Sequence, residues 1–339
     1  MYNLTTLQNE LLQGVGPSGF EDNLRATLVR LLQPYADEIS IDTLGNLICR
    51  RKGSGPKIVI DAQMDTIGFV VSGVDGSGKI SFVPLGNHNI DLLSGEKVQL
   101  EGGTCAEIQL RTSEKTPAPE KQSCHDMFLC PDVCNDCVQQ VLPNVGTPAV
   151  FKQRVVTQED GLVQAPHLSG VCGAMTAILT MQQLDFCPND LYFVFSVQSE
   201  VGFRGIRSAV YNLEPYAYIR LAAAQAIDAT LRPSMGPAIA YKNEYAVWNA
   251  EIIDALWQGA EKADITCQYK VNETGAVLPN EVCVQLSRGG VAAGELAIPV
   301  LGYHTAQECY CPQDVVHAAK VLCATLESGF NAILDVKIK

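Results

Sequence analysis

Hydrophobic residues near the start of the chain recur at helical spacing. Leu4, Leu7 and Leu11 lie three or four residues apart, which places them on one face of a predicted helix. Residues 18–21 have the capping-box pattern, a serine followed three residues later by a glutamate, and predict the start of a second helix. Residues 57–62 are apolar on both faces and predict a strand buried inside a sheet.

The pattern changes between residues 68 and 160. Short alternating runs are separated there by glycine-rich turns, which is typical of a small all-β unit. After this unit, helices and strands alternate again. We predict helices over 171–184, 245–263 and 312–327, and strands over 191–197, 217–222 and 295–299. The chain therefore predicts an α/β domain formed by residues 1–67 and 161–339, with residues 68–160 as an inserted β domain.

Charge excludes several classes of partner. The formal net charge is −13 and charged residues make up 18% of the chain, so no basic surface is expected for nucleic acid or for an anionic membrane. No apolar run approaches the roughly 20 residues that span a bilayer. The first residues lack the basic and apolar regions of a signal peptide. We therefore expect a cytoplasmic protein.

The thirteen cysteines are odd in number and scattered, as expected for reduced thiols. Four of them follow one another closely: Cys124, Cys130, Cys134 and Cys137. Only Cys134 and Cys137 have a spacing common in metal sites, and no second such pair follows at the usual distance. The sequence leaves two interpretations open, packed free thiols, which the spacing favours, and a structural zinc site.

Six short segments form one ordered pattern along the chain, at residues 17–21, 42–48, 64–69, 198–205, 236–239 and 298–304, and Glu308 and Asp314 follow the last of them. Together they resemble the tetrahedral, deblocking and glutamyl aminopeptidases, a family of cytosolic metallopeptidases that remove N-terminal residues from peptides. The resemblance runs along nearly the whole chain. It implies a mixed-sheet, metallo-exopeptidase-like α/β domain with an inserted β-barrel-like domain, and large homo-oligomers. Some relatives are described as endoglucanases, but no carboxylate pair suited to glycoside cleavage is evident.

The resemblance also implies a site with two divalent metals, which activate a water while a glutamate takes its proton. Gln63 stands where the family has a histidine ligand, whereas Asp65, which would orient that histidine, is retained. Ser169 replaces the aspartate that bridges the two metals. Ser199 replaces the general base, and Glu200 beside it is a retained ligand. Two dications at roughly 3.5–4 Å repel strongly without a shared anion, and a serine is a poor proton acceptor near neutral pH.

One further ligand is lost and one is kept. The family's aspartate at the end of the 217–222 strand corresponds to Ala222 or, one residue earlier, to Leu221, and neither is an acid. His304 retains the last ligand position. Glu200 and His304 would serve the same metal in the family. We therefore expect either no metal or one weakly bound zinc, cobalt or manganese ion.

These substitutions predict a pseudoenzyme, a member of the family that is inactive or strongly impaired as an aminopeptidase. One alternative is an active metallo-aminopeptidase with an atypical, mononuclear site. Another is a non-catalytic subunit that binds peptides or regulates active relatives, in homo-oligomers or in hetero-oligomers with those relatives. New nucleophilic chemistry near Ser199 has no support from a recognisable nucleophile elbow.

Overall fold

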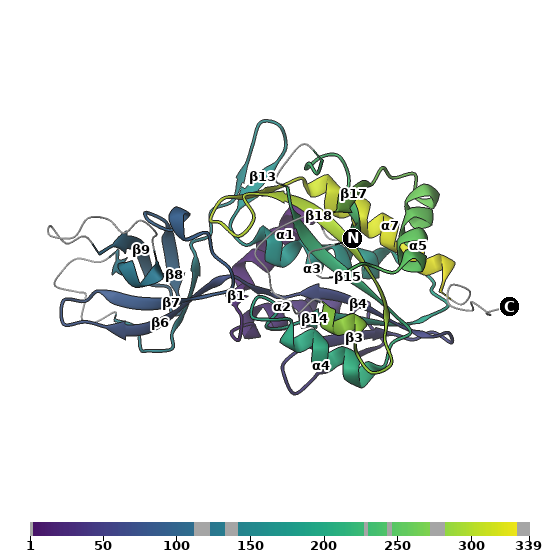
Figure 1. Ribbon diagram of the computed structural model, residues 1–339, viewed down its shortest axis with the longest axis horizontal. Helices are drawn as coiled ribbons and strands as arrows, with labels where there is room; N and C mark the ends of the chain where they lie inside the picture. The colour runs from purple at the N-terminus through teal and green to yellow at the C-terminus, as the bar shows by residue number, and fades with distance from the viewer. Residues whose placement is uncertain are drawn as a thin grey trace.

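The computed structural model describes residues 3–111, 123–132, 142–226, 230–242, 246–271 and 282–330. Two parts lie side by side along the longest axis of the molecule, a β-barrel and a larger body of helices around a sheet (Figure 1). The predicted fold class, a mixed α/β domain with a small β-barrel, is confirmed.

An 11-stranded mixed sheet forms the centre of the larger body. Its main path runs in the order β12, β13, β19, β18, β15, β4, β14, β3, β2, and β16 and β17 extend it beside β18. The strands are β2 (Glu38–Ile41), β3 (Leu47–Arg51), β4 (Lys57–Gln63), β12 (Val156–Thr157), β13 (Val163–Ala165), β14 (Asp190–Ser196), β15 (Ala217–Gln225), β16 (Ala238–Lys242), β17 (Gln268–Val271), β18 (Ala292–Leu301) and β19 (Glu308–Tyr310). The central strands β14, β4, β15 and β18 are parallel neighbours, so their carboxyl ends meet at one edge.

Helices cover both faces of this sheet (Figure 1). They are α1 (Leu4–Gly14), α2 (Asp22–Leu32), α3 (Leu168–Gln183), α4 (Arg204–Leu213), α5 (Ala250–Lys262), α6 (Val282–Gln285) and α7 (Pro312–Ser328). Helices α3, α5 and α7 pack on one face and α4 on the other. Helix α3 approaches β15 so closely that a Cβ on Gly173 would lie 2.4 Å from the Leu221 carbonyl oxygen. This close packing fixes the N-terminus of α3 above the edge where the parallel strands end.

Six strands close into the barrel, in the order β10, β7, β6, β11, β8, β9. They are β6 (Gly68–Val74), β7 (Ile80–Leu85), β8 (Lys97–Leu100), β9 (Cys105–Leu110), β10 (Met127–Pro131) and β11 (Pro148–Phe151). Phe69 forms the centre of the barrel core, with edge-on contacts to Phe82 and Phe151. All six strands fall inside the predicted insertion, although its boundaries at 68 and 160 stay a prediction.

The predicted capping box at residues 18–21 is wrong. Helix α2 begins at Asp22, and its N-cap residue Glu21 makes no capping hydrogen bond with its side chain. The Ser18 hydroxyl instead donates to buried Asp65, and Glu21 accepts from the backbone of Gln198. Both side chains therefore bond to residues far away in the sequence. The buried Asp65 carboxylate needs hydrogen-bond donors, and the Ser18 hydroxyl supplies one of them.

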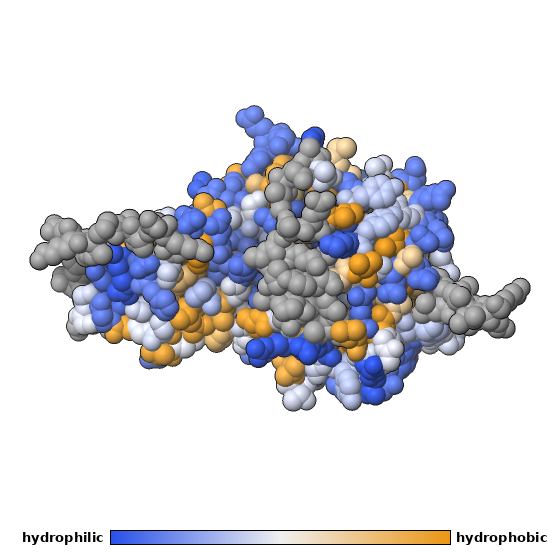
Figure 2. Space-filling view, viewed as in Figure 1, coloured by the Kyte–Doolittle hydropathy of each residue, from blue (hydrophilic) through white to orange (hydrophobic). Residues whose placement is uncertain are grey.

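No helix in the described ranges is long and apolar enough to cross a bilayer. On the face shown in Figure 2, hydrophobic residues are scattered among hydrophilic ones outside the grey atoms. Scattered apolar residues of this kind are ordinary for the surface of a globular protein.

Candidate active site

The residues expected at the site gather where the parallel strands end. Gln63 is the last residue of β4 and pairs with Ser196 at the end of β14. Ser199 and Glu200 follow in the loop between β14 and α4, and His304 follows β18. The carboxyl ends of parallel strands are the usual place for a site in such a sheet.

Asp65 holds the loop that carries Ser199 and Glu200. Its carboxylate is fully buried and accepts hydrogen bonds from the backbone N–H of Ser199 and of Glu200, each at 2.9 Å. It also accepts from the Ser18 hydroxyl at 2.5 Å. Burial, together with the nearby charge of Glu200, raises the pKa of Asp65 to about 7. Asp65 therefore orients a loop, where the family resemblance implied that it orients a histidine.

Both carboxylate oxygens of Glu200 have partners. The Gln63 side-chain N–H donates to Oε1 at 2.8 Å, and His304 Nε2 lies 3.4 Å from Oε2. Burial opposes the charge of Glu200, but the facing His304, the Gln63 donor and Arg220 together outweigh it and lower the pKa of Glu200. Burial likewise opposes the charge of His304, but Glu200, Glu308 and the Asn87 carbonyl together outweigh it and raise the pKa of His304. The two side chains therefore form a buried ion pair.

The backbone and ring of His304 are both fixed. Its φ of 61° is in the left-handed region, and its N–H donates to Glu308 at 2.8 Å. The ring Nδ1–H donates to the carbonyl oxygen of Asn87 at 3.1 Å. Because Nδ1 is held as a donor, Nε2 is the ring nitrogen that faces Glu200.

Ser169 donates its hydrogen bonds to a different carboxylate, that of Glu308. It lies in the first turn of α3, where its backbone N–H and its hydroxyl donate to the two oxygens of Glu308 at 2.6 and 2.7 Å. Glu308 is buried, and this burial raises its pKa despite these bonds. Sequence reasoning had placed Glu308 in the family pattern without a role. Its role here is to tie the start of α3 to the loop that carries His304.

Ala222 faces the site and Leu221 does not. Leu221 pairs with Ala62 in β4, and its backbone lies under Gly173 of α3. Because side chains alternate along a strand, Ala222 points to the opposite face, the one shared with Gln63. It lies in a small buried cluster with Ala224, Leu231, Ala238 and Ala297. A methyl group therefore stands where the resemblance implied an acidic ligand.

Comparison with known proteins identifies the scaffold. The family profile described as M42 glutamyl aminopeptidase matches residues 45–321. The chain belongs to this family. It is 29% identical over 316 residues to a protein of Acetivibrio thermocellus, covering 91% of this chain and 94% of that one. It is 26% identical over 333 residues to the lysyl aminopeptidase of Pyrococcus furiosus, covering 95% and 96%. A solved aminopeptidase from Desulfurococcus kamchatkensis superposes with a TM-score of 0.90, at 25% identity over 99% of both chains.

The M42 family is known to use divalent metals, but these residues do not fit a two-metal centre. Within the described ranges, no three His, Cys, Asp or Glu side chains are grouped so that they could hold an ion. Ser169 is bonded to Glu308, and Ala222 offers no donor atom. Gln63 presents its N–H, and not its carbonyl oxygen, to Glu200. The bridging position therefore has no carboxylate, and the positions of Gln63 and Ala222 offer no charged or imidazole ligand.

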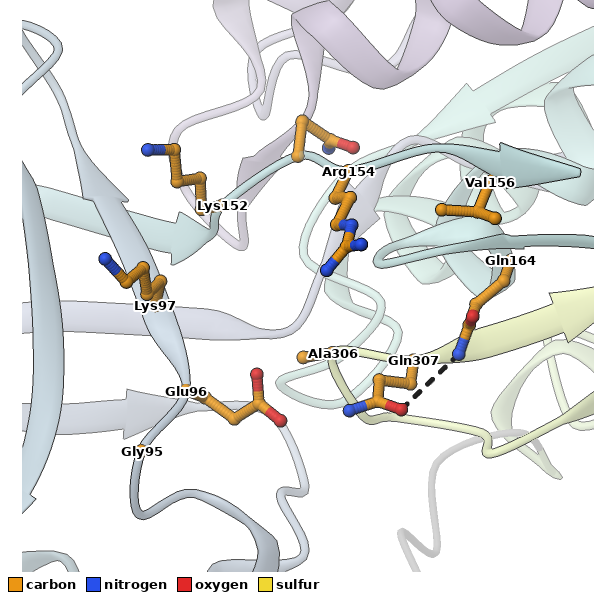
Figure 3. A pocket seen from close by; sticks show the side chains of 10 residues that line it. Gly95, Glu96, Lys97, Lys152, Arg154, Val156, Gln164, Ala306 and Gln307 are labelled. Atoms are coloured by element: carbon orange, nitrogen blue, oxygen red, sulfur yellow. Dashed lines mark hydrogen bonds between the residues drawn. The ribbon is translucent and has the colours of Figure 1, made fainter.

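A cavity of about 540 Å³ lies beside the loop that carries His304, and it is separate from the M42 site (Figure 3). Ala306 and Gln307 belong to this loop, and Gln164 donates to Gln307 across one wall. Arg154 points into the cavity, while Lys97 is paired with Asp132 at 2.9 Å. Its walls are mainly exposed side chains of the barrel and of β12–β13, and none of the residues expected at the site lines it.

Two of the four clustered cysteines lie within the described residues. Cys124 and Cys130 are free thiols, and Cys124 packs against the barrel core. Cys134 and Cys137 lie outside the described residues. Packed free thiols and a structural zinc site both stay predictions for this cluster.

Proposed function

We propose that this chain is an M42-family protein that does not carry out two-metal aminopeptidase chemistry. One observation supports this most directly. The two oxygens of Glu200, a ligand position of the family, face the N–H of Gln63 and the ring of His304. Gln63 thus holds one oxygen of Glu200 by a hydrogen bond, and the other faces His304 as an ion pair, although His304 Nε2 makes no hydrogen bond within the described ranges.

The general base is also absent. Ser199, at the family's base position, lies 3.4 Å from the Ser196 hydroxyl and does not accept protons near neutral pH. Asp65 is the adjacent carboxylate, but three hydrogen bonds already hold it in the loop. No described acid is therefore free at this position to take a proton from water.

A peptide panel tests the proposal. The purified protein is incubated with peptides and amino-acyl fluorogenic amides that have free N-termini, with added Zn²⁺, Co²⁺ or Mn²⁺. An active M42 enzyme assayed in parallel is the positive control. We expect no turnover above background. Turnover that a chelator abolishes, that both Glu200→Ala and His304→Ala remove, and that needs two metal ions per chain would contradict the proposal.

A mononuclear metallo-aminopeptidase is a second candidate. Two ligands of one tetrahedral ion, each at about 2.0–2.1 Å from it, lie about 3.3–3.4 Å apart. His304 Nε2 and Glu200 Oε2 are separated by 3.4 Å, which agrees with that spacing as well as with an ion pair. Metal content of the purified protein distinguishes the two, because only this candidate holds one ion per chain that Glu200→Gln removes.

We further propose that the protein assembles into homo-oligomers in the cytoplasm and binds peptides. The solved TET1 peptidase of Pyrococcus horikoshii can assemble into a tetrahedron or a large octahedral shell. Light scattering coupled to gel filtration measures the assembly of this chain. Co-purification with an active M42 relative would favour a hetero-oligomer, in which this chain serves as a regulatory subunit.

A further inference from the structure

A cavity of about 540 Å³ lies where the barrel, the hairpin of β12 and β13 and the loop that carries His304 meet (Figure 3). Its lining comes from segments far apart in the sequence: residues 95–97, 152–154, 156, 164 and 306–307. Small-molecule sites in proteins have volumes of roughly 300–1,000 Å³. The cavity therefore has the size of a site for a small ligand, and such a ligand would contact the barrel and the larger body together.

Contacts between these segments fix the shape of the cavity. Ala306 packs against the hydrophobic core of the barrel and so joins its loop to that domain. The Gln164 side-chain N–H donates to the Gln307 side-chain oxygen at 3.4 Å, which joins β13 to the same loop. The backbone N–H of Lys152 donates to the carbonyl oxygen of Lys97 at 2.8 Å. The cavity is therefore built into the fold and is not a gap between loose segments.

Two opposite charges face the cavity from different walls. The Glu96 carboxylate points into it from the barrel, and the Arg154 guanidinium points into it from the link between the barrel and β12 (Figure 3). Within the described ranges, neither side chain has a hydrogen-bond or ion-pair partner. Lys97 is paired with Asp132 at 2.9 Å, and the Lys97 and Lys152 side chains point away from the cavity in the same view. Among the described residues, the cavity thus presents one free carboxylate and one free guanidinium.

We propose that this cavity binds a zwitterionic ligand, a free amino acid or a dipeptide, whose ammonium bonds to Glu96 and whose carboxylate bonds to Arg154. A guanidinium presents two parallel N–H donors that match the two oxygens of a carboxylate. An ionised carboxylate only accepts hydrogen bonds, and an ammonium only donates them. A ligand with one charge would satisfy one of these side chains and not the other, so the cavity should prefer a ligand with both charges. The inference deepens the peptide binding proposed above and rests on it, but it does not depend on the absence of catalysis.

Isothermal titration of the full chain tests the inference, with a chelator present to keep metal out of the M42 site. The ligands are alanine and alanylalanine, each also as its N-acetyl form, which lacks the ammonium, and as its amide, which lacks the carboxylate. The proteins are wild type, Glu96→Gln, Arg154→Gln and Arg207→Gln. The first two substitutions each remove one charge and keep a polar side chain at a position that is not fully buried. Arg207→Gln is the matched control, because Arg207 is an exposed arginine of α4 that does not line the cavity.

We expect wild type to bind alanine or alanylalanine at least about fivefold more tightly than either blocked form of the same compound. Arg154→Gln should weaken this binding by a similar factor and should no longer distinguish the free ligand from its amide. Glu96→Gln should also weaken it and should no longer distinguish the free ligand from its N-acetyl form. Arg207→Gln should bind as wild type does. The tighter of the two ligands identifies whether the cavity takes an amino acid or a dipeptide, and both results support the inference.

No binding of either zwitterion would overturn the inference, and so would blocked forms that bind wild type as tightly as the free ligand. Binding that is unchanged in both Glu96→Gln and Arg154→Gln would place the ligand elsewhere and overturn the inference, while the proposed peptide binding would stand. Melting curves establish that each variant is folded before its binding is compared. Peptide turnover, by contrast, would overturn the proposed absence of catalysis and leave this inference intact, so the two failures are distinguishable.

Discussion

The side-chain amide of Gln63 donates to Glu200 across the parallel strands β4 and β14, at 2.8 Å. A second donor bond runs from the same nitrogen to the carbonyl oxygen of Asp65, at 3.2 Å. Gln63 thus links the retained carboxylate of Glu200 to the residue that orients its loop. The contact makes a neutral amide part of the site's electrostatics, because it stabilises Glu200 without adding charge.

Replacing Gln63 with an acid should show how strongly Glu200 depends on a neutral donor at position 63. In Gln63→Glu, two carboxylates would face one another in a buried place, so one of them would hold a proton near neutral pH. We expect the variant to lose roughly 3 kcal/mol of unfolding free energy at pH 8 and less at pH 5. Gln63→Leu, which removes the bond without adding charge, should lose about 1–2 kcal/mol at both pH values. Urea unfolding measures both, and equal losses for the two variants at pH 8 would contradict this account.

Ser169 gives a second test, on the other side of the site. Ser169→Ala removes one hydrogen bond to Glu308 but leaves two backbone donors, from residue 169 and from His304. We expect a loss of about 1 kcal/mol. Ser169→Asp restores the acid of the family position beside a buried carboxylate and should cost at least about 3 kcal/mol at pH 8. Thermal unfolding with and without Co²⁺ measures these losses. Stabilisation of Ser169→Asp by Co²⁺ would show that the site still accepts a cation.

Much of this site could be predicted from the sequence because its members follow strands or lie in motifs. Gln63 ends a strand that is apolar on both faces, and Glu200 and His304 each come shortly after one. The bond between Ser18 and Asp65 could not be predicted, because its partners are 47 residues apart and the local pattern around Ser18 favoured a helix cap. Side-chain pairing across a fold depends on packing that no short pattern encodes.

A row of buried charged residues, Asp61, Arg220 and Glu295, crosses the sheet one step below the site and was missed for a related reason. Arg220 and Glu295 become neighbours only because β15 and β18 pair in register, and Lys270 reaches them from β17. The sequence around Arg220 indicates a buried strand, but it does not indicate which acidic residue pairs with this arginine. One signal was available: an arginine in an apolar run must find a buried acid, since an unpaired buried charge is costly.

Acid should destabilise the barrel through His88. Its Nε2–H donates to the carbonyl oxygens of Gly68 and Leu85, and its Nδ1 finds no hydrogen-bond partner within the described ranges. Burial lowers the pKa of His88 to about 4. Below the unfolded pKa of about 6.5, the unfolded chain binds a proton that the folded chain cannot, so stability is lost as the pH falls from about 6.5 towards 4.

His88→Gln keeps an N–H donor but does not titrate. We expect it to lose about 2 kcal/mol less stability than wild type between pH 7 and pH 5. Denaturant unfolding at the two pH values measures the difference. His125→Gln, at an exposed histidine, is the control and should follow wild type. A pH dependence of His88→Gln equal to that of wild type would place the acid sensitivity elsewhere.

Rebuilding the family's ligands should restore metal to the site. The combined variant Gln63→His, Ser169→Asp, Ser199→Glu and Ala222→Asp supplies the missing donors and the base around retained Glu200 and His304. We expect the metal content of this variant, measured by elemental analysis, to rise towards two ions per chain, because the bridging carboxylate and the other lost ligands are then present. Wild type should contain less than one ion per chain. A folded variant that still contains less than one ion would mean that the lost ligands alone do not keep metal out of this chain.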